Sequence, residues 1–475
     1  MKKMIIMFLF GSLIFSGCMK QEKEDVPVEE QAKEEIKEIA YGASLFDDSS
    51  VHRIDVTLAD EDWQDLLDDP SAKTKYNADI TIDGETFRDV SFSTKGNSSL
   101  IFVALDENSS RYSFKVNFSK NNKEQTYHGL DKLSLNNLYH DPTFMRDHLC
   151  YMLFDKMGVA SPATSYVLLY INGEERGLYM ACEDVEKGFL KRQFDKEGVI
   201  YKPECAGLAL DMESGKDILN GGDLYIPEPK GADLVYIDDQ ISSYPDIFEN
   251  AQTHSEDEDK YIVIGALKKL NEKKNLEEIL DTDEVITYFA LQSFVQNYDS
   301  YIGPMLHNYY LYEKDGRLSI LPWDYNLAFG RFSHVDPGEY YHSQDNFINC
   351  GIDTPLISTK EGDRPLFAWI VNEEEYLNRY HDIYDSFLRE CVESGLLNKK
   401  IEETYDLIRP YVEKDKTAFY DVAAFEEAIK QLKGYLELRS ASVRAQLDGK
   451  LASRSEMQKK EDQIDTSTVD LSKLS

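Results

Sequence analysis

Alternating apolar and polar residues predict β-strands throughout the first part of the chain. The alternating segments are residues 51–58, 78–82, 85–92, 112–118, 165–171 and 176–182. Asp83-Gly84 and Asn172-Gly173 separate two pairs of these segments, and such dipeptides favour two-residue hairpin turns. The first part of the chain is therefore predicted to be a β-sheet built largely from hairpins.

Apolar residues at spacings of three and four predict helices, first at residues 60–67 and 142–158 and then along most of the later chain. In the segment 142–158, Met145 and Leu149 fall on one face and Gly158 ends the pattern. The later helical segments are residues 261–280, 282–296, 365–371, 374–394, 399–413 and 419–448. Strands with few helices followed by a helical part predict an α+β protein.

One further hairpin brings polar residues together. Asp315-Gly316 is its turn, so Asn308 before the first strand and Asp324 after the second stand at the same open end. Asp299 lies in the loop just upstream and can reach the same place. Carboxylates and a carboxamide are oxygen ligands of the kind that Mg²⁺ takes alongside phosphates. The order Asp, Asn, hairpin, Asp also occurs in the catalytic region of protein kinases, whereas the alternative is an ordinary surface hairpin with acidic flanks.

A second candidate feature is the loop Lys95-Gly96-Asn97-Ser98, which follows a predicted strand. Backbone N–H groups and hydroxyls of such a loop can cradle phosphate, although the same residues are ordinary turn formers. Lys115 stands in the middle of the next strand, about twenty residues later. It is either a solvated lysine or one that pairs with phosphates.

These features divide the chain into a β-rich N-lobe at residues 44–186, which carries one helix, and a mainly helical C-lobe at residues 187–448. This is the arrangement of a divergent two-lobe protein kinase. Glu183 begins the connector between the lobes, where the adenine of a nucleotide would dock against the backbone. Residues 205–260 are polar and acidic and are expected to form an insertion with little core of its own. Residues 449–475 form a polar tail that is expected to fray.

Composition excludes several classes of protein and of binding partner. The 475 residues include 30 Tyr and 23 Phe, which fits a folded protein and not a disordered one. The net charge is 52 − 88 = −36, so nucleic acids and anionic membrane surfaces are poor partners and basic proteins are better ones. Of the six cysteines, five follow Cys18, and no two form a Cys-x-x-Cys motif. This odd number predicts buried free thiols and argues against a disulfide framework or a zinc site.

The N-terminus is typical of a processing signal. A positively charged start precedes a short apolar segment, residues 4–15, which is too short to span a bilayer. The segment runs into Phe-Ser-Gly-Cys18, which is similar to a bacterial lipoprotein cleavage box. A signal at residues 1–18 and a polar tether at residues 19–43 therefore predict an extracytoplasmic protein anchored to a membrane through lipid at Cys18. The alternatives are a plain secretory signal and an uncleaved anchor.

Seven short motifs between residues 51 and 332 occur in a specific order. They are Lys95-Gly-Asn-Ser-Ser, Arg111-Tyr-Ser-Phe-Lys115, Met145-Arg-Asp-His-Leu149, Tyr170-Ile-Asn-Gly with Gly177-Leu-Tyr, Asn297-Tyr-Asp-Ser300, His307-Asn-Tyr-Tyr-Leu-Tyr312 and Pro322-Trp-Asp-Tyr325. Together these motifs resemble the spore coat protein H (CotH) family of atypical protein kinases.

The resemblance implies a kinase-like fold that uses ATP and a divalent cation, usually Mg²⁺ with Mn²⁺ as a substitute. It implies that Asp324 holds the metal, that Asp299 acts on the substrate hydroxyl and that Lys115 contacts phosphate. In the predicted reaction Asn308 shares the metal with Asp324, and Lys95 neutralises phosphate charge. Lys95 stands where many family members are expected to have Arg, which keeps the charge but loses a bidentate hydrogen-bonding fork.

The predicted function is transfer of the γ-phosphoryl group of ATP to Ser or Thr of a spore-coat or cell-surface protein. The acidity of the chain favours a basic, Ser-rich acceptor. Because ATP is scarce outside cells, an extracytoplasmic enzyme needs an enclosed space or another phosphate source. Two alternatives stay open: a surface-anchored coat or wall assembly protein with a kinase-like fold and no activity, and a hydrolase that uses the same carboxylates. The sequence contains no Gly-x-Ser-x-Gly or His-Glu-x-x-His motif to support the hydrolase.

Overall fold

The structure is a computed structural model that describes residues 41–194, 198–205, 208, 210–222, 225–331 and 343–474. These residues belong to one compact unit, Glu38–Ser475. The predicted signal at residues 1–18 and nearly all of the predicted tether lie outside the described residues. In the described ranges, no helix is long and apolar enough to cross a bilayer.

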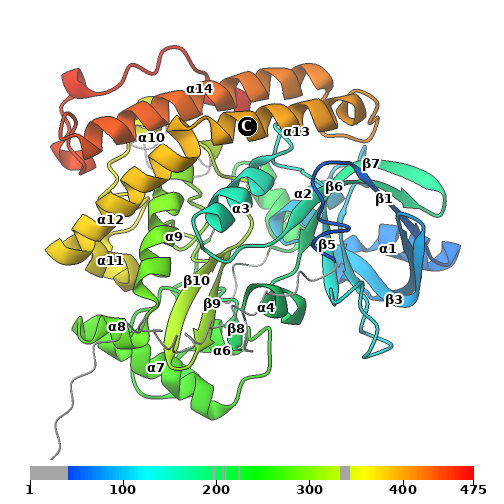
Figure 1. Ribbon diagram of the computed structural model, residues 1–475. Helices are drawn as coiled ribbons and strands as arrows, with labels where there is room; N and C mark the ends of the chain where they lie inside the picture. Colours follow the sequence, from blue (N-terminus) through cyan, green and yellow to red (C-terminus); the bar gives the residue numbers. More distant parts are fainter. Residues whose placement is uncertain are drawn as a thin grey trace, which may run out of the picture. The chain divides into compact units, whose positions relative to one another are not determined.

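In the described chain, seven strands close into a barrel in the order β1-β2-β3-β4-β5-β7-β6 (Figure 1). Neighbouring strands are antiparallel except β1 and β6, which run parallel with Ile54 opposite Leu169. The strands are β1 (His52–Thr57), β2 (Tyr76–Ile82), β3 (Glu85–Lys95), β4 (Ser113–Asn117), β5 (Lys132–Asn136), β6 (Thr164–Ile171) and β7 (Glu174–Glu183). The predicted hairpins are confirmed. The expected plain N-lobe sheet of a kinase is wrong, because β1 pairs with β6 and closes the sheet.

The barrel is closed around an apolar core. Phe92 and Phe114 stack with their ring centroids 4.8 Å apart. Ile54, Val116 and Leu133 are fully buried in the same core. Because protein interiors are close-packed, this filling fixes the positions of the strand ends and of the polar side chains that they carry.

A three-stranded sheet and most of the helices form the rest of the described chain. The sheet has the order β10-β9-β8, with β8 (Val199–Tyr201), β9 (Tyr309–Lys314) and β10 (Arg317–Pro322). The helices are α1 (Asp60–Asp68), α2 (Ser98–Leu105), α3 (Arg146–Lys156), α4 (Lys187–Gln193), α5 (Met212–Leu219), α6 (Pro245–Phe248), α7 (Asp257–Glu272), α8 (Leu276–Ile279), α9 (Thr282–Val295), α10 (Gln344–Ile348), α11 (Pro365–Asn372), α12 (Glu374–Phe387), α13 (Leu396–Val412) and α14 (Val422–Leu447). A mixed α+β protein with a helical second part is therefore confirmed.

Two local differences from the predicted elements have clear causes. The predicted helix at residues 261–280 is divided into α7 and α8, because Lys273 and Asn275 adopt left-handed backbone angles between them. The predicted phosphate loop is shorter than expected, because α2 begins at Ser98 and buries Leu100 on its inner side.

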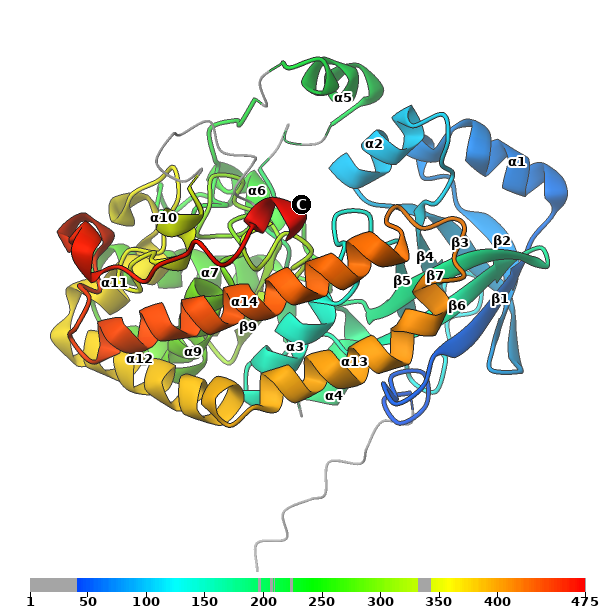
Figure 2. The same cartoon turned by 90° about the horizontal axis from the view of Figure 1, so that it is seen from above.

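The C-terminal segment is ordered against the core, so the expectation that residues 449–475 fray is wrong. Leu451, Leu471 and Leu474 are buried, and burial of leucine side chains outweighs the polar composition of the segment. The guanidinium of Arg146 on α3 also donates to the backbone oxygen of Leu474. In Figure 2 this segment runs back beside α14 to the C-terminus.

The acidic insertion at residues 205–260 contributes side chains to the main core of the protein. Tyr244 and Ile247 are fully buried there. The hydroxyl of Tyr244 also accepts hydrogen bonds from the backbone N–H groups of Ile237 and Asp238. The insertion is therefore anchored by aromatic and aliphatic burial.

A buried ion pair joins the barrel to the loop between α13 and α14. Nη1 of Arg111 lies 2.8 Å from Oδ2 of Asp415, and both side chains are 2% exposed. The backbone N–H of Leu178 donates to the same carboxylate at 2.9 Å. Gly177 has a φ of 86°, and a Cβ at this position would lie 2.1 Å from the Asp415 carboxylate. The carboxylate therefore occupies space that glycine leaves open.

We expect Asp415→Ala to lower the free energy of unfolding by about 3–5 kcal/mol, because it leaves the buried Arg111 guanidinium without its charged partner. Urea denaturation followed by circular dichroism measures this change. Lys416→Ala, at an exposed position in the same loop, is the matched control and should change stability by less than about 0.5 kcal/mol. Equal midpoints for the two variants would contradict the role of the ion pair.

Candidate functional site

The open end of the hairpin β9–β10 brings the two predicted metal ligands together. Tyr309 pairs with Pro322, so Asn308 and Asp324 leave the hairpin at the same end. Both residues have left-handed backbone angles, with φ of 55° and 53°. Non-glycine residues adopt this conformation rarely, and it persists where surrounding contacts hold it, often at functional sites.

Asp299 joins this end of the hairpin through direct hydrogen bonds. Nδ2 of Asn308 donates to Oδ2 of Asp299 at 2.9 Å, and Nε2 of His307 contacts Oδ1 of Asp299. Asn297, in the same loop after α9, donates from Nδ2 to the backbone oxygen of Asp324 at 3.0 Å. The structure thus brings Asp299, Asn308 and Asp324 together at the place that the sequence indicates.

Several carboxylates lie close together at this site, where Asp147 is buried and Asp299 and Asp324 are partly buried. Burial raises the pKa of Asp324, the charge of Lys95 opposes this rise and Asp299 adds to it. Burial and the charge of Asp324 raise the pKa of Asp147, on α3, to about 8. Burial acts to lower the pKa of His307, but Asp299 outweighs it and the pKa is raised. Because buried like charges repel strongly, a bound cation would stabilise this arrangement.

Lys95, at the end of β3, faces these carboxylates. Its Nζ donates to Oδ1 of Asn136 on β5 at 2.8 Å. The same atom lies 5.5 Å from the ring centroid of Trp323, the residue before Asp324. The closed barrel therefore places the ammonium group of Lys95 beside the end of the hairpin.

The remainder of the predicted phosphate loop borders a neighbouring cavity. Gly96 has a φ of 118°, and a Cβ there would lie 3.1 Å from Oγ of Ser99, so the turn after Lys95 requires glycine. Ser98 begins α2, and Oδ1 of Asn97 accepts a hydrogen bond from the backbone N–H of Leu210 at 3.2 Å. Asn97 therefore connects this loop to the acidic insertion.

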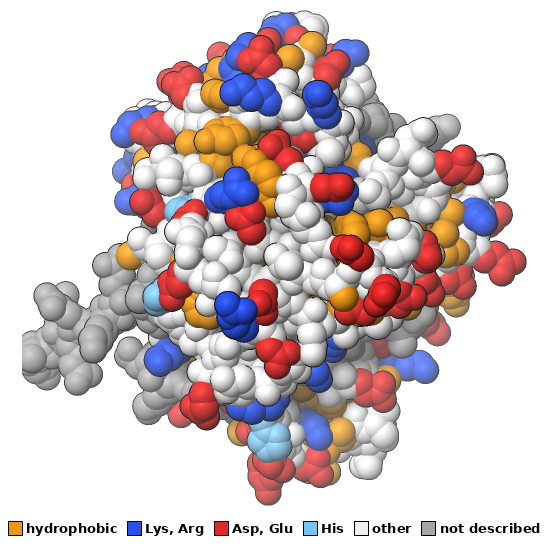
Figure 3. Space-filling view, turned by 90° about the vertical axis from the view of Figure 1, so that its right-hand side faces the viewer, with side chains coloured by type: hydrophobic (Ala, Val, Ile, Leu, Met, Phe, Trp, Pro, Cys, Tyr) orange, Lys and Arg blue, Asp and Glu red, His pale blue; other side chains and the backbone are white. Residues whose placement is uncertain are grey.

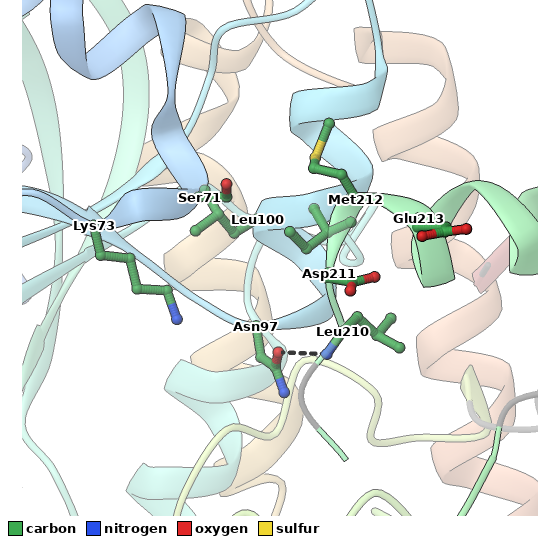
Figure 4. Close-up of a pocket in the computed structure, with 9 residues that line it drawn as sticks. Ser71, Lys73, Asn97, Leu100, Leu210, Asp211, Met212 and Glu213 are labelled. Carbon is green, nitrogen blue, oxygen red and sulfur yellow. Dashed lines mark hydrogen bonds between the residues drawn. The ribbon is translucent and has the colours of Figure 1, made fainter. Parts of the chain in front are cut away.

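The cavity beside Asn97 lies between α2 and the start of α5 (Figure 4). Its volume is about 400 Å³, and it is lined by Ser71, Lys73, Asn97, Leu100, Ile101, Leu210, Asp211, Met212 and Glu213. Apolar side chains from both α2 and the insertion contribute to the lining, together with the carboxylates of Asp211 and Glu213. The cavity therefore offers apolar surface and negative charge next to the loop that follows Lys95.

Lys115 on β4 is paired with acidic residues that follow β7. Its Nζ lies 2.6 Å from Oδ2 of Asp184 and 3.8 Å from Oε1 of Glu186. Oγ of Ser134 donates to the other oxygen of Asp184 at 2.5 Å. Burial acts to raise the pKa of Asp184, but Lys115 and Lys95 outweigh it and lower the pKa. The sequence analysis missed Asp184 and Glu186 as partners of the lysine, although the acidic run directly after a strand was a visible signal.

The carboxylate of Glu183 holds parts of the fold together. Its fully buried carboxylate accepts hydrogen bonds from the Tyr41 hydroxyl at 2.5 Å, from Arg192 at 2.5 Å and from the backbone N–H of Ala163 at 3.0 Å. Its own N–H donates to the backbone oxygen of Ala163 at 2.9 Å. Its side chain and its N–H group thus have partners in the fold, and docking of adenine against the backbone at Glu183 stays a prediction. Tyr41, the first described residue, is fully buried and lies before the predicted boundary at Ser44.

The donor set at the hairpin fits Mg²⁺ held jointly by protein and phosphate. Asp324, Asn308 and Asp299 offer oxygen atoms, which this cation prefers. Among the described residues, no three His, Cys, Asp or Glu side chains are grouped as a metal site. The five cysteines after Cys18 are buried and free, as predicted. The chain therefore supplies few metal ligands here, and waters and phosphates would complete the coordination of Mg²⁺.

Comparison with protein families identifies one matching model. The model described as CotH kinase protein matches residues 92–443, from within β3 to within α14. The match covers the barrel strands that carry Lys95 and Lys115, the hairpin and most of the helices.

Two curated proteins of Bacillus subtilis (strain 168) are similar to the chain. Inner spore coat protein H is 24% identical over 325 residues, which cover 66% of this chain and 78% of that protein. Inner spore coat protein H-like protein is 33% identical over 89 residues, which cover 19% of this chain and 27% of that protein. The first similarity extends over most of both chains.

We expect Lys95→Met to reduce thermal stability more at high pH than at low pH. The substitution removes a charge that lowers the pKa of Asp324 and Asp184 against the effect of burial, so both folded-state pKa values rise relative to the wild type. A carboxyl group with a raised folded-state pKa loses stability as pH increases through that pKa. The difference in melting temperature between wild type and variant should therefore grow as pH rises above 3.8, the ordinary pKa of the Asp324 carboxyl group.

The matched control for this measurement is Lys120→Met, which removes an exposed lysine shortly after β4. Its melting temperature should follow that of the wild type across the same pH range. A constant difference between Lys95→Met and the wild type at every pH would contradict the electrostatic role of Lys95.

Proposed function

Because the chain belongs to the CotH kinase protein family, we propose that it transfers the γ-phosphoryl group of ATP to Ser or Thr of an acceptor protein. The observation that carries this proposal is the meeting of Asp299, Asn308 and Asp324 at the open end of one hairpin. Lys95 faces the same end from the barrel. Protein kinases use this set of groups, two carboxylates, a carboxamide and a lysine, for phosphoryl transfer.

Each side chain has a distinct role in the proposed reaction. Asp324 and Asn308 would hold Mg²⁺, or Mn²⁺ in its place, against the phosphates. The cation would supply the positive charge that neutralises the phosphate oxygens. Lys95, Lys115 and the N–H groups and hydroxyl of residues 96–98 would bind the phosphates and hold the γ-phosphoryl group in line with the acceptor.

Asp299 is the proposed base. Its carboxylate orients the acceptor hydroxyl and accepts the hydroxyl proton as the new P–O bond forms and ADP leaves. The hydrogen bond from Asn308 and the contact with His307 fix the carboxylate of Asp299 at one end of the hairpin. Phosphoryl transfer depends mainly on positioning and electrostatics, and these contacts provide the positioning of the Asp299 carboxylate.

The acceptor that we propose is a basic, Ser-rich protein of a spore coat or cell surface. The net charge of −36 favours it, and Figure 3 shows Asp and Glu side chains spread widely over one face of the molecule. The name of the similar protein, inner spore coat protein H, supports a coat or surface location. Attachment to a membrane through lipid at Cys18 stays a prediction from the sequence.

The test is transfer of ³²P from γ-labelled ATP with Mg²⁺ or Mn²⁺ to the protein itself and to a Ser/Lys-rich peptide. We expect wild-type protein to label the peptide, and Asp324→Asn or Asp299→Asn to lower the rate by about 10²–10³-fold, because each removes a charge that acts in the transition state. A peptide with the same serines and Glu in place of Lys should accept less label. The difference in labelling between the two peptides should become smaller at high salt.

Asp315→Asn is the matched control, because it changes a carboxylate at the closed end of the same hairpin. Its transfer rate should equal that of the wild type. Equal labelling by Asp324→Asn and wild type would contradict the proposed site. Absence of both labelling and ATP binding in the wild type would instead favour a coat or wall assembly protein without catalysis.

A further inference from the structure

The backbone around Asp324 is held by α3, a helix that the proposed reaction does not otherwise use. The N–H of Asp324 donates to the hydroxyl of Tyr151 at 2.9 Å. The N–H of Tyr325 donates to Oδ1 of Asp147 at 2.5 Å. Asp147 and Tyr151 are four residues apart on α3, so they lie on the same face of the helix and hold two consecutive N–H groups.

Two backbone carbonyl groups in the segment that begins at Asp324 also accept hydrogen bonds. The carbonyl of Asp324 accepts from Asn297, and the carbonyl of Asn326 accepts from Nη1 of Arg146 at 3.4 Å. Asp147 and Tyr151 are 5% and 3% exposed, so solvent does not replace these contacts readily. The left-handed φ of 53° at Asp324 is unfavourable for a residue with a Cβ and needs such support.

The helix that supplies these contacts is itself fixed on several sides. α3 packs against α9, α13 and β6. Nδ1 of His148 lies 2.9 Å from the hydroxyl of Thr164 at the start of β6, and Arg146 binds the C-terminal segment at Leu474. The position of α3 is therefore set by both the barrel and the helical part.

We propose that Asp147 and Tyr151 are positioning residues that aim the carboxylate of Asp324 at the divalent cation. Neither side chain needs to touch the metal. They hold the Asp324–Tyr325 peptide in the one conformation from which the carboxylate faces Asn308 and Asp299. This inference rests on the proposed function and adds that α3 sets the affinity of the site for its cation.

The direct test is binding of Mn²⁺ in the presence of ADP, followed by electron paramagnetic resonance without any acceptor protein. Tyr151→Phe removes the acceptor of the Asp324 N–H, and Asp147→Ala removes the acceptor of the Tyr325 N–H. We expect both variants to bind Mn²⁺ at least about 10-fold more weakly than the wild type, because a misdirected carboxylate is a poorer ligand. Asp147→Asn keeps an oxygen at the position of Oδ1 and should stay within about threefold of the wild type.

Tyr166→Phe is the matched control. Tyr166 is also buried, and its hydroxyl donates to the backbone oxygen of Phe144 at 2.8 Å and not to the Asp324–Tyr325 peptide. This variant should lose stability to a similar extent as Tyr151→Phe and bind Mn²⁺ like the wild type. Melting temperatures measured on all variants separate a loss of stability from a loss of metal affinity.

Two results would overturn the inference, and they are distinguishable. If Tyr151→Phe and Asp147→Ala bind Mn²⁺ like the wild type while Asp324→Asn does not, α3 does not position the ligand and the proposed function stands. If the wild type binds no Mn²⁺ with ADP and transfers no label, both the inference and the proposed function fail. Rescue in Asp147→Asn together with loss in Asp147→Ala supports positioning by a hydrogen bond.

Discussion

Burial of several carboxylates where the barrel meets the hairpin is the constraint on which the rest of the structure depends. Asp147 and Asp184 are buried and Asp324 is partly buried, and an unbalanced charge in such an environment is costly. Lys115 pairs directly with Asp184, and the charge of Lys95 acts on both Asp184 and Asp324. Positive charge is therefore supplied from the barrel, and a bound cation would balance the negative charge that remains.

The closed barrel explains how this balance is kept. Lys115 on β4 lies opposite Ser134 on β5, and Ser134 lies opposite Cys182 on β7, two residues before Asp184. This register places the lysine and the hydroxyl side by side on neighbouring strands, with the carboxylate of Asp184 directly after the end of β7. Lys95 ends β3 and meets Asn136 at the end of β5. A packed barrel holds these strand ends more firmly than an open sheet with free edges does.

The helical part completes the site from the other side. α9 delivers the chain to Asn297 and Asp299, and the hairpin places Asn308 and Asp324 beside them. The Arg111–Asp415 ion pair and the ordered C-terminal segment join helices far along the chain to the barrel and to α3. Contacts distant in the sequence thus fix the distance between the lysines and the acidic end of the hairpin.

The sequence predicted the parts of the site that depend on local pattern. Asp315-Gly316 set the hairpin, and the hairpin alone determined that Asn308 and Asp324 would meet. The sequence did not predict closure of the barrel. The parallel pairing of β1 with β6 joins strands more than a hundred residues apart, and no turn motif indicates this pairing. The sequence did not predict the partners of the Glu183 carboxylate for a similar reason, since Tyr41 and Arg192 become its neighbours only in the folded chain.

The contact made by Asp147 within the site could not be predicted from the sequence either. Its contact with the Tyr325 N–H joins two motifs across a separation of 178 residues, and no local pattern signals it. Side chains that hydrogen-bond to the backbone beside a metal-ligand residue form no recognisable pattern in a single sequence. They are found when the backbone groups that they hold are located in the structure.

The most direct measurement is a crystal structure of the protein with Mn²⁺ and a non-hydrolysable ATP analogue, with the metal located by its anomalous scattering. We expect Mn²⁺ bonded to oxygen atoms of Asp324 and Asn308 at about 2.1–2.2 Å, with phosphate oxygens completing its coordination and Lys95 and Lys115 within reach of the phosphates. Binding of the metal and the nucleotide away from the hairpin end, with Asp324 still enclosed by its present neighbours, would contradict the proposed site.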